Sequence, residues 1–157
     1  MERKHHTVGE AAAALGYRHD RMLERIRGLT GSLLAAVEAG ARSTAHDEHA
    51  NLVSWCEDEL IPHMLAEEGP LYGGAHATPE GGLLVEALLQ EHQSLVGLVD
   101  ELRAASGVKA AAIGFMIARL FTLHVGQEER LLLPFIAASP VLSLAEAVGS
   151  LEDVVED

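Results

Sequence analysis

Two segments of this chain share a pattern of residues that can bind a metal. His63 and Glu67 are four residues apart, and so are His124 and Glu128. Positions i and i+4 lie on the same face of an α-helix, so each pair can direct an imidazole nitrogen and a carboxylate oxygen at one point. First-row transition metals accept this mixture of ligands. Two such segments on facing helices would give a site for two cations.

The composition is typical of a helical single-domain protein. The 157 residues are 48 % hydrophobic and only 4 % aromatic, with alanine and leucine dominating over β-branched residues. This balance favours helix over sheet, and the length fits one domain with a substantial core. The sequence contains no glycine-rich phosphate loop, nucleophile elbow or Cys-x-x-Cys pair, which excludes those motifs as the source of its chemistry.

Charge and cysteine content restrict the partners and the compartment. A formal net charge of −13 argues against nucleic acid and against anionic membrane surfaces. The longest apolar run, around residues 110–118, is shorter than the roughly 20 residues that cross a bilayer, and the N-terminus lacks a signal-peptide layout. Cys56 is the only cysteine, so no internal disulfide can form. We therefore expect a cytoplasmic protein with no membrane and no nucleic-acid partner.

Hydrophobic spacing predicts an all-α fold, an up-down-up-down four-helix bundle. Thr7 and Glu10 have the spacing of a capping box, so the first helix is expected to start there and to end at Gly40. Pro62 predicts a kink in the second helix, and Pro134 is expected to end the fourth. The remaining helices are predicted over about residues 44–68, 82–105 and 108–133, and the pattern over 142–155 allows a short fifth helix.

These helices suggest three parts of the chain. Gly16 can bend or divide the first helix, so residues 1–16 are expected to form an N-terminal extension or the first helical turns. Residues 17–136 would form the bundle, and residues 137–157 a C-terminal amphipathic segment. That segment could pack on the bundle or on a second copy, so the sequence allows a monomer or a homodimer.

Four histidines are expected at one depth in the bundle. Two residues of an antiparallel helical hairpin are level when they are equidistant from the turn that joins the helices. The candidates are one histidine from each helix: His19, His63, His92 and His124. The first two are equidistant from the turn at Gly40, the last two from the turn at Gly107, and the middle two from the 73–82 loop. These imidazoles should therefore gather with Glu67 and Glu128 around one point.

The same rule excludes two other histidines from this site. His49 and His46 would lie level with Leu33 and Ala36 of the first helix. Neither leucine nor alanine offers a metal ligand, so we expect both histidines to lie outside the centre.

Two further His-x-x-x-Glu pairs are not expected to lie on one helix. His76 and Glu80 are separated by Pro79, within a glycine-rich loop. His6 and Glu10 lie on opposite sides of the predicted helix start. Spacing alone is therefore weak evidence for a metal site, and spacing combined with common depth is much stronger.

The alternative to metal binding is that these residues are ordinary helical side chains. An isolated histidine such as His19 is most often a solvated or core residue, but burying six ionisable groups without a metal would cost several kcal/mol each. Glu68 and Glu129 lie about 100° further round the helix than their neighbours, so we interpret them as solvated residues. Whether Glu129 or a tyrosine, Tyr17 or Tyr72, also binds the metal is left open.

The order of these motifs resembles the hemerythrin-like, His-His-Glu cation-binding family over about residues 19–134. The shared features are a histidine in the first helix, His-x-x-x-Glu closing the second, and Glu91-His92 opening the third. The most specific one is His-x-x-x-Glu-Glu-x-x-Leu-x-Pro, from His124 to Pro134.

The resemblance implies a non-haem centre of two iron ions. His19, His63, His92 and His124 would be terminal nitrogen ligands, and Glu67 and Glu128 would bridge the irons alongside an oxo or hydroxo group. The chain departs from the oxygen-carrying hemerythrins in two ways. Val96 stands where they have a second histidine in the third helix. They also use a carboxylate five residues after the histidine of the fourth helix, whereas here Glu128 takes a four-residue spacing, although Glu129 occupies the five-residue position. These departures favour peroxide or nitric oxide chemistry, or sensing, over simple oxygen carriage.

The function expected from the sequence is that of a di-iron protein that binds or reacts with peroxide, O2 or NO. Catalase-like disproportionation of peroxide is its enzymatic form, and whether the protein is an enzyme stays open. One alternative is a non-catalytic sensor or carrier of O2, NO or iron. Another is a zinc-bound or metal-free helical interaction module, and manganese is also compatible with a carboxylate–imidazole site.

Overall fold

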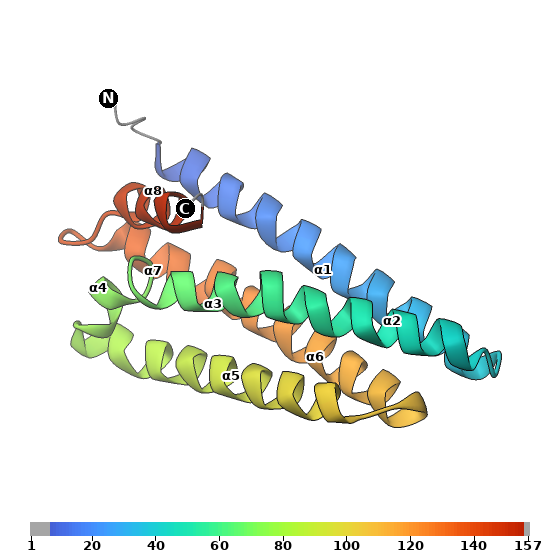
Figure 1. Cartoon of the computed structure of the whole chain (residues 1–157). Helices are drawn as coiled ribbons and strands as arrows, with labels where there is room; N and C mark the ends of the chain where they lie inside the picture. Colours follow the sequence, from blue (N-terminus) through green and yellow to red (C-terminus); the bar gives the residue numbers. More distant parts are fainter. Residues whose placement is uncertain (1–6, 156–157) are drawn as a thin grey trace.

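The chain folds as a bundle of two antiparallel helical pairs (Figure 1). The computed structural model describes residues 7–155, with side chains up to residue 151, and within this range the protein is helical without strands. The elements are α1 (Val8–Glu38), α2 (Arg42–Trp55), α3 (Ile61–Glu68), α4 (Gly73–His76), α5 (Pro79–Ala104), α6 (Gly107–Gln127), α7 (Leu133–Ala138) and α8 (Leu144–Val155). The predicted all-α bundle is confirmed.

Helix α1 is continuous, and capping defines its ends. Thr7 Oγ1 accepts the Glu10 N–H at 3.3 Å, and the Thr7 N–H donates to the Glu10 carboxylate at 2.7 Å, so the predicted capping box is confirmed. The helix passes through Gly16 and is not divided there. Gly40 follows its end with a φ of 66°, a conformation that glycine adopts at low cost.

Two π turns explain how long helices pass through proline residues. Cys56–Leu60 (η1) joins α2 to α3, and Glu128–Leu132 (η2) joins α6 to α7. Each π turn ends two residues before a proline, Pro62 or Pro134. The wider turn moves aside the carbonyl that a proline ring would otherwise meet. Where a kink was expected at Pro62, the structure has a π turn directly before the proline. The expectation that the fourth helix ends before Pro134 was wrong, because the helix continues through α7.

Helix α5 begins three residues earlier than expected, at Pro79. Thr78 is its N-cap, because its hydroxyl accepts the Gly81 N–H at 3.0 Å, and proline is well suited to the first helical position. The short helix α4 lies in the loop that was expected to consist of turns alone.

A layer of buried histidines and glutamates separates two apolar clusters of the core. One cluster fills the half of the bundle next to the α1–α2 and α5–α6 turns, and it contains Met22, Ile26, Leu95 and Phe121. The other lies at the α8 end, and it contains Leu15, Leu71, Leu88 and Leu132. In α1, for example, His19 lies between Leu15 of one cluster and Met22 of the other. The polar layer is therefore enclosed on both sides.

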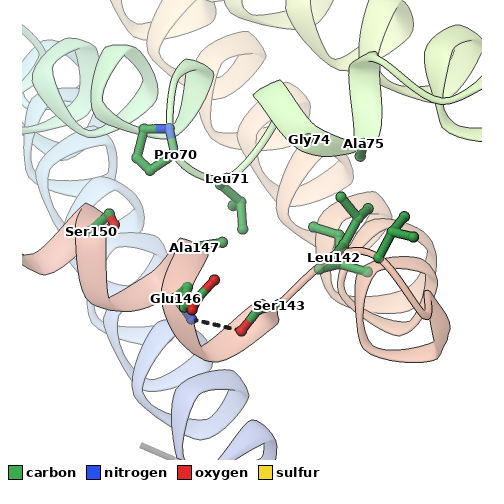
Figure 2. A pocket seen from close by; sticks show the side chains of 11 residues that line it. Pro70, Leu71, Gly74, Ala75, Leu142, Ser143, Glu146, Ala147 and Ser150 are labelled. Atoms are coloured by element: carbon green, nitrogen blue, oxygen red, sulfur yellow. Dashed lines mark hydrogen bonds between the residues drawn. The ribbon is translucent and has the colours of Figure 1, made fainter. Parts of the chain in front are cut away.

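The C-terminal segment forms the fifth helix, α8, which packs on α1 and α3. Its buried residues are Leu144, Val148 and Leu151. Ser143 Oγ accepts the Glu146 N–H at 3.3 Å in its first turn (Figure 2). A pocket of about 270 Å³ remains between α8 and the segment that leads into α4, with Leu71 and Ala147 on its two sides (Figure 2). The helix therefore closes the end of the bundle.

By length and composition alone, the continuous helix Gly107–Ala138 could cross a membrane. Half of its most apolar 18-residue stretch is buried inside the bundle. The helix also supplies His124 and Glu128 to the polar layer. Both features are typical of a core helix.

Candidate metal centre

The six side chains predicted to bind metal converge in the middle of the bundle. His19, His63, His92, His124, Glu67 and Glu128 come from α1, α3, α5, α6 and η2, and none is more than 2 % exposed. Their donor atoms form two sets, and the atoms of each set lie within 4.8 Å of one another. One set is His19, His63 and Glu67, and the other is Glu67, His92, His124 and Glu128. The expected common depth of the histidines is thus observed.

The two carboxylates lie between the two sets. Glu67 Oε1 is 3.3 Å from His19 Nε2 and 2.9 Å from His63 Nε2, whereas its Oε2 is 3.8 Å from His92 Nε2. Glu128 Oε1 is 3.3 Å from His124 Nε2, and its Oε2 is 3.4 Å from His19 Nε2. Each glutamate therefore directs one oxygen toward each set, as a carboxylate that joins two cations must.

Tyr72 adds an oxygen to the second set. Its hydroxyl is 3.3 Å from His92 Nε2 and 3.2 Å from His124 Nε2, and it donates a short hydrogen bond to Glu128 Oε1. The residue is 1 % exposed and stacks on the His92 ring. Tyr17, by contrast, is 64 % exposed. Sequence spacing could not show which of the two tyrosines lies at the centre. Tyr72 follows the end of α3, and the turn after that helix brings it to the centre.

Three buried polar atoms of the two donor sets have no geometrically aligned hydrogen-bond partner within the described residues. They are His63 Nε2, which is close to Glu67 Oε1 without such a bond, Glu67 Oε2 and Glu128 Oε2. An unsatisfied buried polar group costs about 1–3 kcal/mol, and more when it is charged. Cations placed among these atoms would satisfy all three, and imidazole and carboxylate are suitable ligands for transition metals. The residues present therefore fit a pair of metal ions.

Three of the four imidazoles are held from behind by a second carboxylate. The Nδ1–oxygen pairs are His19–Glu129 at 3.1 Å, His92–Glu68 at 2.9 Å and His124–Glu91 at 2.8 Å. Such partners fix the ring orientation and leave Nε2 to face the metal. His63 Nδ1 has no such partner in the part of the chain that the structure describes.

The interpretation of Glu68 and Glu129 as solvated residues needs correction. Their side chains are 36 % and 37 % exposed, but each also pairs with a central histidine on another helix. In both Glu-Glu pairs the first carboxylate lies at the centre, and the second reaches around to a neighbouring imidazole. The only trace of this role in the sequence is the repeated Glu-Glu dipeptide, which by itself does not show what the second carboxylate contacts.

The electrostatics of the centre favour the ionised form of Glu67. Burial alone would raise the pKa of Glu67, but His63 and His19 hold it far below its usual value. Burial opposes charge on His124, yet its contacts with Glu128 and Glu67 raise the pKa to about 9. The pKa of His92 is lowered by burial and by His124. Metal ligands must be deprotonated, so Glu67 is ready to bind a cation, whereas His124 must first release a proton.

Apolar residues surround the centre. Phe121 is fully buried and packs edge-on to His63 and parallel to His124, at ring distances of 6.4 and 6.5 Å. Leu23 is buried in the same core cluster, and Val96 packs against it. Val96 thus adds an apolar side chain at the position where the oxygen-carrying hemerythrins have a second histidine.

The other histidines of the described residues, His46, His49 and His76, belong to neither donor set. His49 Nε2 lies 2.7 Å from the Leu102 carbonyl oxygen and ties α2 to α5. His76 pairs with Glu86 at 2.7 Å on the surface. His6 lies outside the described residues. His46, His49 and His76 are therefore not part of the centre.

Comparison with known proteins gives one result. The family model of the hemerythrin HHE cation-binding domain matches residues 13–136. No curated protein and no solved structure gives a significant match. The matched range contains every residue of the two donor sets. The chain belongs to the hemerythrin HHE cation-binding domain family.

Proposed function

We propose that this protein holds two iron ions in the candidate metal centre and binds or reacts with a small ligand, either peroxide, O2 or NO. The observation that carries the proposal is the pair of buried donor sets that share Glu67, with three of their polar atoms left without a hydrogen-bond partner among the described residues. Iron is the metal implied by the hemerythrin resemblance, and the donor atoms are compatible with it.

The chain's residues divide into three roles. His19 and His63 would hold one cation, His92 and His124 the other, and Glu67 and Glu128 would join them. A pair of iron ions supplies one-electron redox change at each ion and an open coordination position for a small ligand. Tyr72 is close enough to the second set to serve as an oxygen ligand or as a hydrogen-bond donor to Glu128.

The enclosure of the centre supports small, uncharged ligands. All six candidate ligands are buried, and Phe121 lies against two of the imidazoles. An apolar wall of this kind excludes bulk water and disfavours entry of charged molecules. Peroxide, O2 and NO all satisfy this restriction on size and charge.

The first experiment measures metal content and the absorption spectrum of the protein purified in air. We expect about two iron atoms per chain and near-ultraviolet absorption that zinc-loaded or metal-free protein lacks. An iron content near zero after expression in iron-replete medium would contradict the proposal and favour a zinc-bound or metal-free interaction module.

The second experiment separates an enzyme from a sensor or carrier. Peroxide consumption is measured for the iron-loaded protein, for the same concentration of free iron and for His63→Ala. Turnover above free iron that is lost in His63→Ala supports catalase-like disproportionation. No turnover above free iron would exclude that activity, and O2 and NO binding to the reduced protein would then be measured.

A further inference from the structure

A groove of about 340 Å³ lies on the outside of the bundle, between α1 and the α2–η1 segment. Three arginines and two aromatic residues line it: Arg18, Arg21, Arg25, Tyr17 and Trp55. Its volume is in the range of small-molecule sites, which are about 300–1,000 Å³. The groove does not include any residue of the metal centre.

The groove is locally cationic on a strongly acidic protein. The chain has 11 basic residues against 24 acidic ones, yet three of the 11 line this one groove. Glu59 is the only acidic residue among them. Arg18 and Arg25 have no hydrogen bond or ion pair with any described residue, whereas Arg103 elsewhere pairs with two carboxylates. Their guanidinium groups are thus available to an anion.

The apolar part of the groove can take a planar ring. Trp55 is half-buried against the core, and Met22, only 8 % exposed, lines the groove beside it. On the other side, the Arg21 guanidinium lies 5.8 Å from the centre of the Tyr17 ring and donates to its hydroxyl at 3.2 Å. Aromatic and guanidinium planes both stack on flat rings, and guanidinium also pairs with phosphate or carboxylate.

The groove lies beside one half of the metal centre. Met22 is three residues after His19 in α1, and Glu59 is four residues before His63 in the paired segment. Each is about one helical turn from a candidate ligand, on the side toward the α1–α2 turn. A molecule in the groove would therefore lie on the outside of the bundle at about the level of the His19–His63 set.

We propose that this groove binds a small aromatic anion, a planar ring that carries a phosphate-like group. The ring would lie against Trp55 and Met22, and the anionic group would contact Arg18, Arg21 and Arg25. A ligand with both parts matches the whole lining. A simple anion would contact only the arginines, and a neutral ring would contact only the aromatic and apolar side chains.

The test uses the full-length, metal-loaded protein and three probes: AMP, adenosine and inorganic phosphate. Trp55 is the only tryptophan, so its fluorescence, excited where adenine does not absorb, reports on this groove directly. We expect AMP to change this fluorescence saturably and to bind about tenfold more tightly than either adenosine or phosphate. Equal affinity for AMP and adenosine, equal affinity for AMP and phosphate, or no saturable change would each overturn the proposal.

Variants assign the binding to the groove. The double variant Arg18→Gln/Arg25→Gln should weaken AMP binding about tenfold or more, measured by calorimetry. Arg119→Gln removes an exposed arginine that does not line the groove, and it should leave AMP affinity unchanged. A similar loss in both variants would mean a general charge effect and would contradict the site. Metal content is measured beside each titration, so a failure here is distinguishable from a failure of the proposed function.

Discussion

His19 Nδ1 and Glu129 Oε1 lie 3.1 Å apart, although 110 residues separate them in the chain. This contact connects α1 to η2 directly behind the metal centre. The carboxylate also lies close to the backbone of α1 one turn before His19, since a Cβ at Gly16 would be 3.7 Å from the same oxygen, an ordinary van der Waals contact. The ring of His19 is thereby held with Nε2 toward Glu67 and Glu128.

We expect Glu129→Gln to bind metal about 10–100-fold more weakly than the parent, because an amide is a poorer partner for the Nδ1–H of His19. Competition with a chelator of known affinity measures the change. Glu68→Gln should behave in the same way through His92. Glu38→Gln is the control, since Glu38 is exposed at the end of α1. Parent-like affinity in both centre variants would show that these carboxylates do not orient the ligands.

The loss of Glu67 should be more severe than the loss of any one histidine. Glu67 belongs to both donor sets, so Glu67→Ala should release most of the metal from both positions, as measured by elemental analysis after gel filtration. His49→Ala is the matched control. It should keep its metal and lose about 1 kcal/mol of stability with the hydrogen bond to Leu102. Metal loss in His49→Ala would contradict the assignment by depth.

Tyr72 should give the ferric protein a distinctive colour. Burial and the charge of Glu128 raise the pKa of this phenol well above its usual value, so without metal it stays protonated. A bound cation favours the ionised form of its ligands. We therefore expect a visible phenolate-to-iron charge-transfer band that Tyr72→Phe lacks while it keeps its iron. The same spectrum in both proteins would leave Tyr72 as a hydrogen-bond donor to Glu128 alone.

The metal-free protein should lose stability at alkaline pH. The pKa of His124 is about 9 in the folded state, because Glu128 and Glu67 outweigh the opposing effect of burial. The folded-state pKa of His124 is thus above the unfolded value of about 6.5. The protonated imidazole therefore stabilises the folded protein fully below about pH 6.5, and this stabilisation is lost as the pH rises through about 9. Urea denaturation at several pH values measures this change. The metal-loaded protein should not show it, because a bound imidazole carries no proton at the ligand nitrogen.

The sequence was sufficient to predict the helical bundle and the convergence of the four histidines. Both follow from helical periodicity and from the distances to Gly40 and Gly107, which are local properties of the chain. The same reasoning correctly excluded His49, whose position relative to the turn does not match the centre.

The contacts of Tyr72, Glu68 and Glu129 could not be assigned in this way. Tyr72 leaves the end of a helix through an irregular turn, so no periodicity fixes its direction. Glu68 and Glu129 reach across to histidines of other helices, and side-chain reach between helices depends on their packing. The continuation of the fourth helix past Pro134 was missed because a proline rule describes an α turn and not the wider π turn that precedes it.

The two π turns give the chain one extra residue at two points. Removing one residue from Cys56–Leu60 would close this segment to an ordinary α turn and leave His63 and Glu67 close to their present directions. The ring of Pro62 would then meet the carbonyl about one turn before it. A deletion in the α-helical part of α2 would instead rotate both ligands by about 100°. Each five-residue segment therefore lets a long helix contain a proline while the side chains beyond it keep their direction.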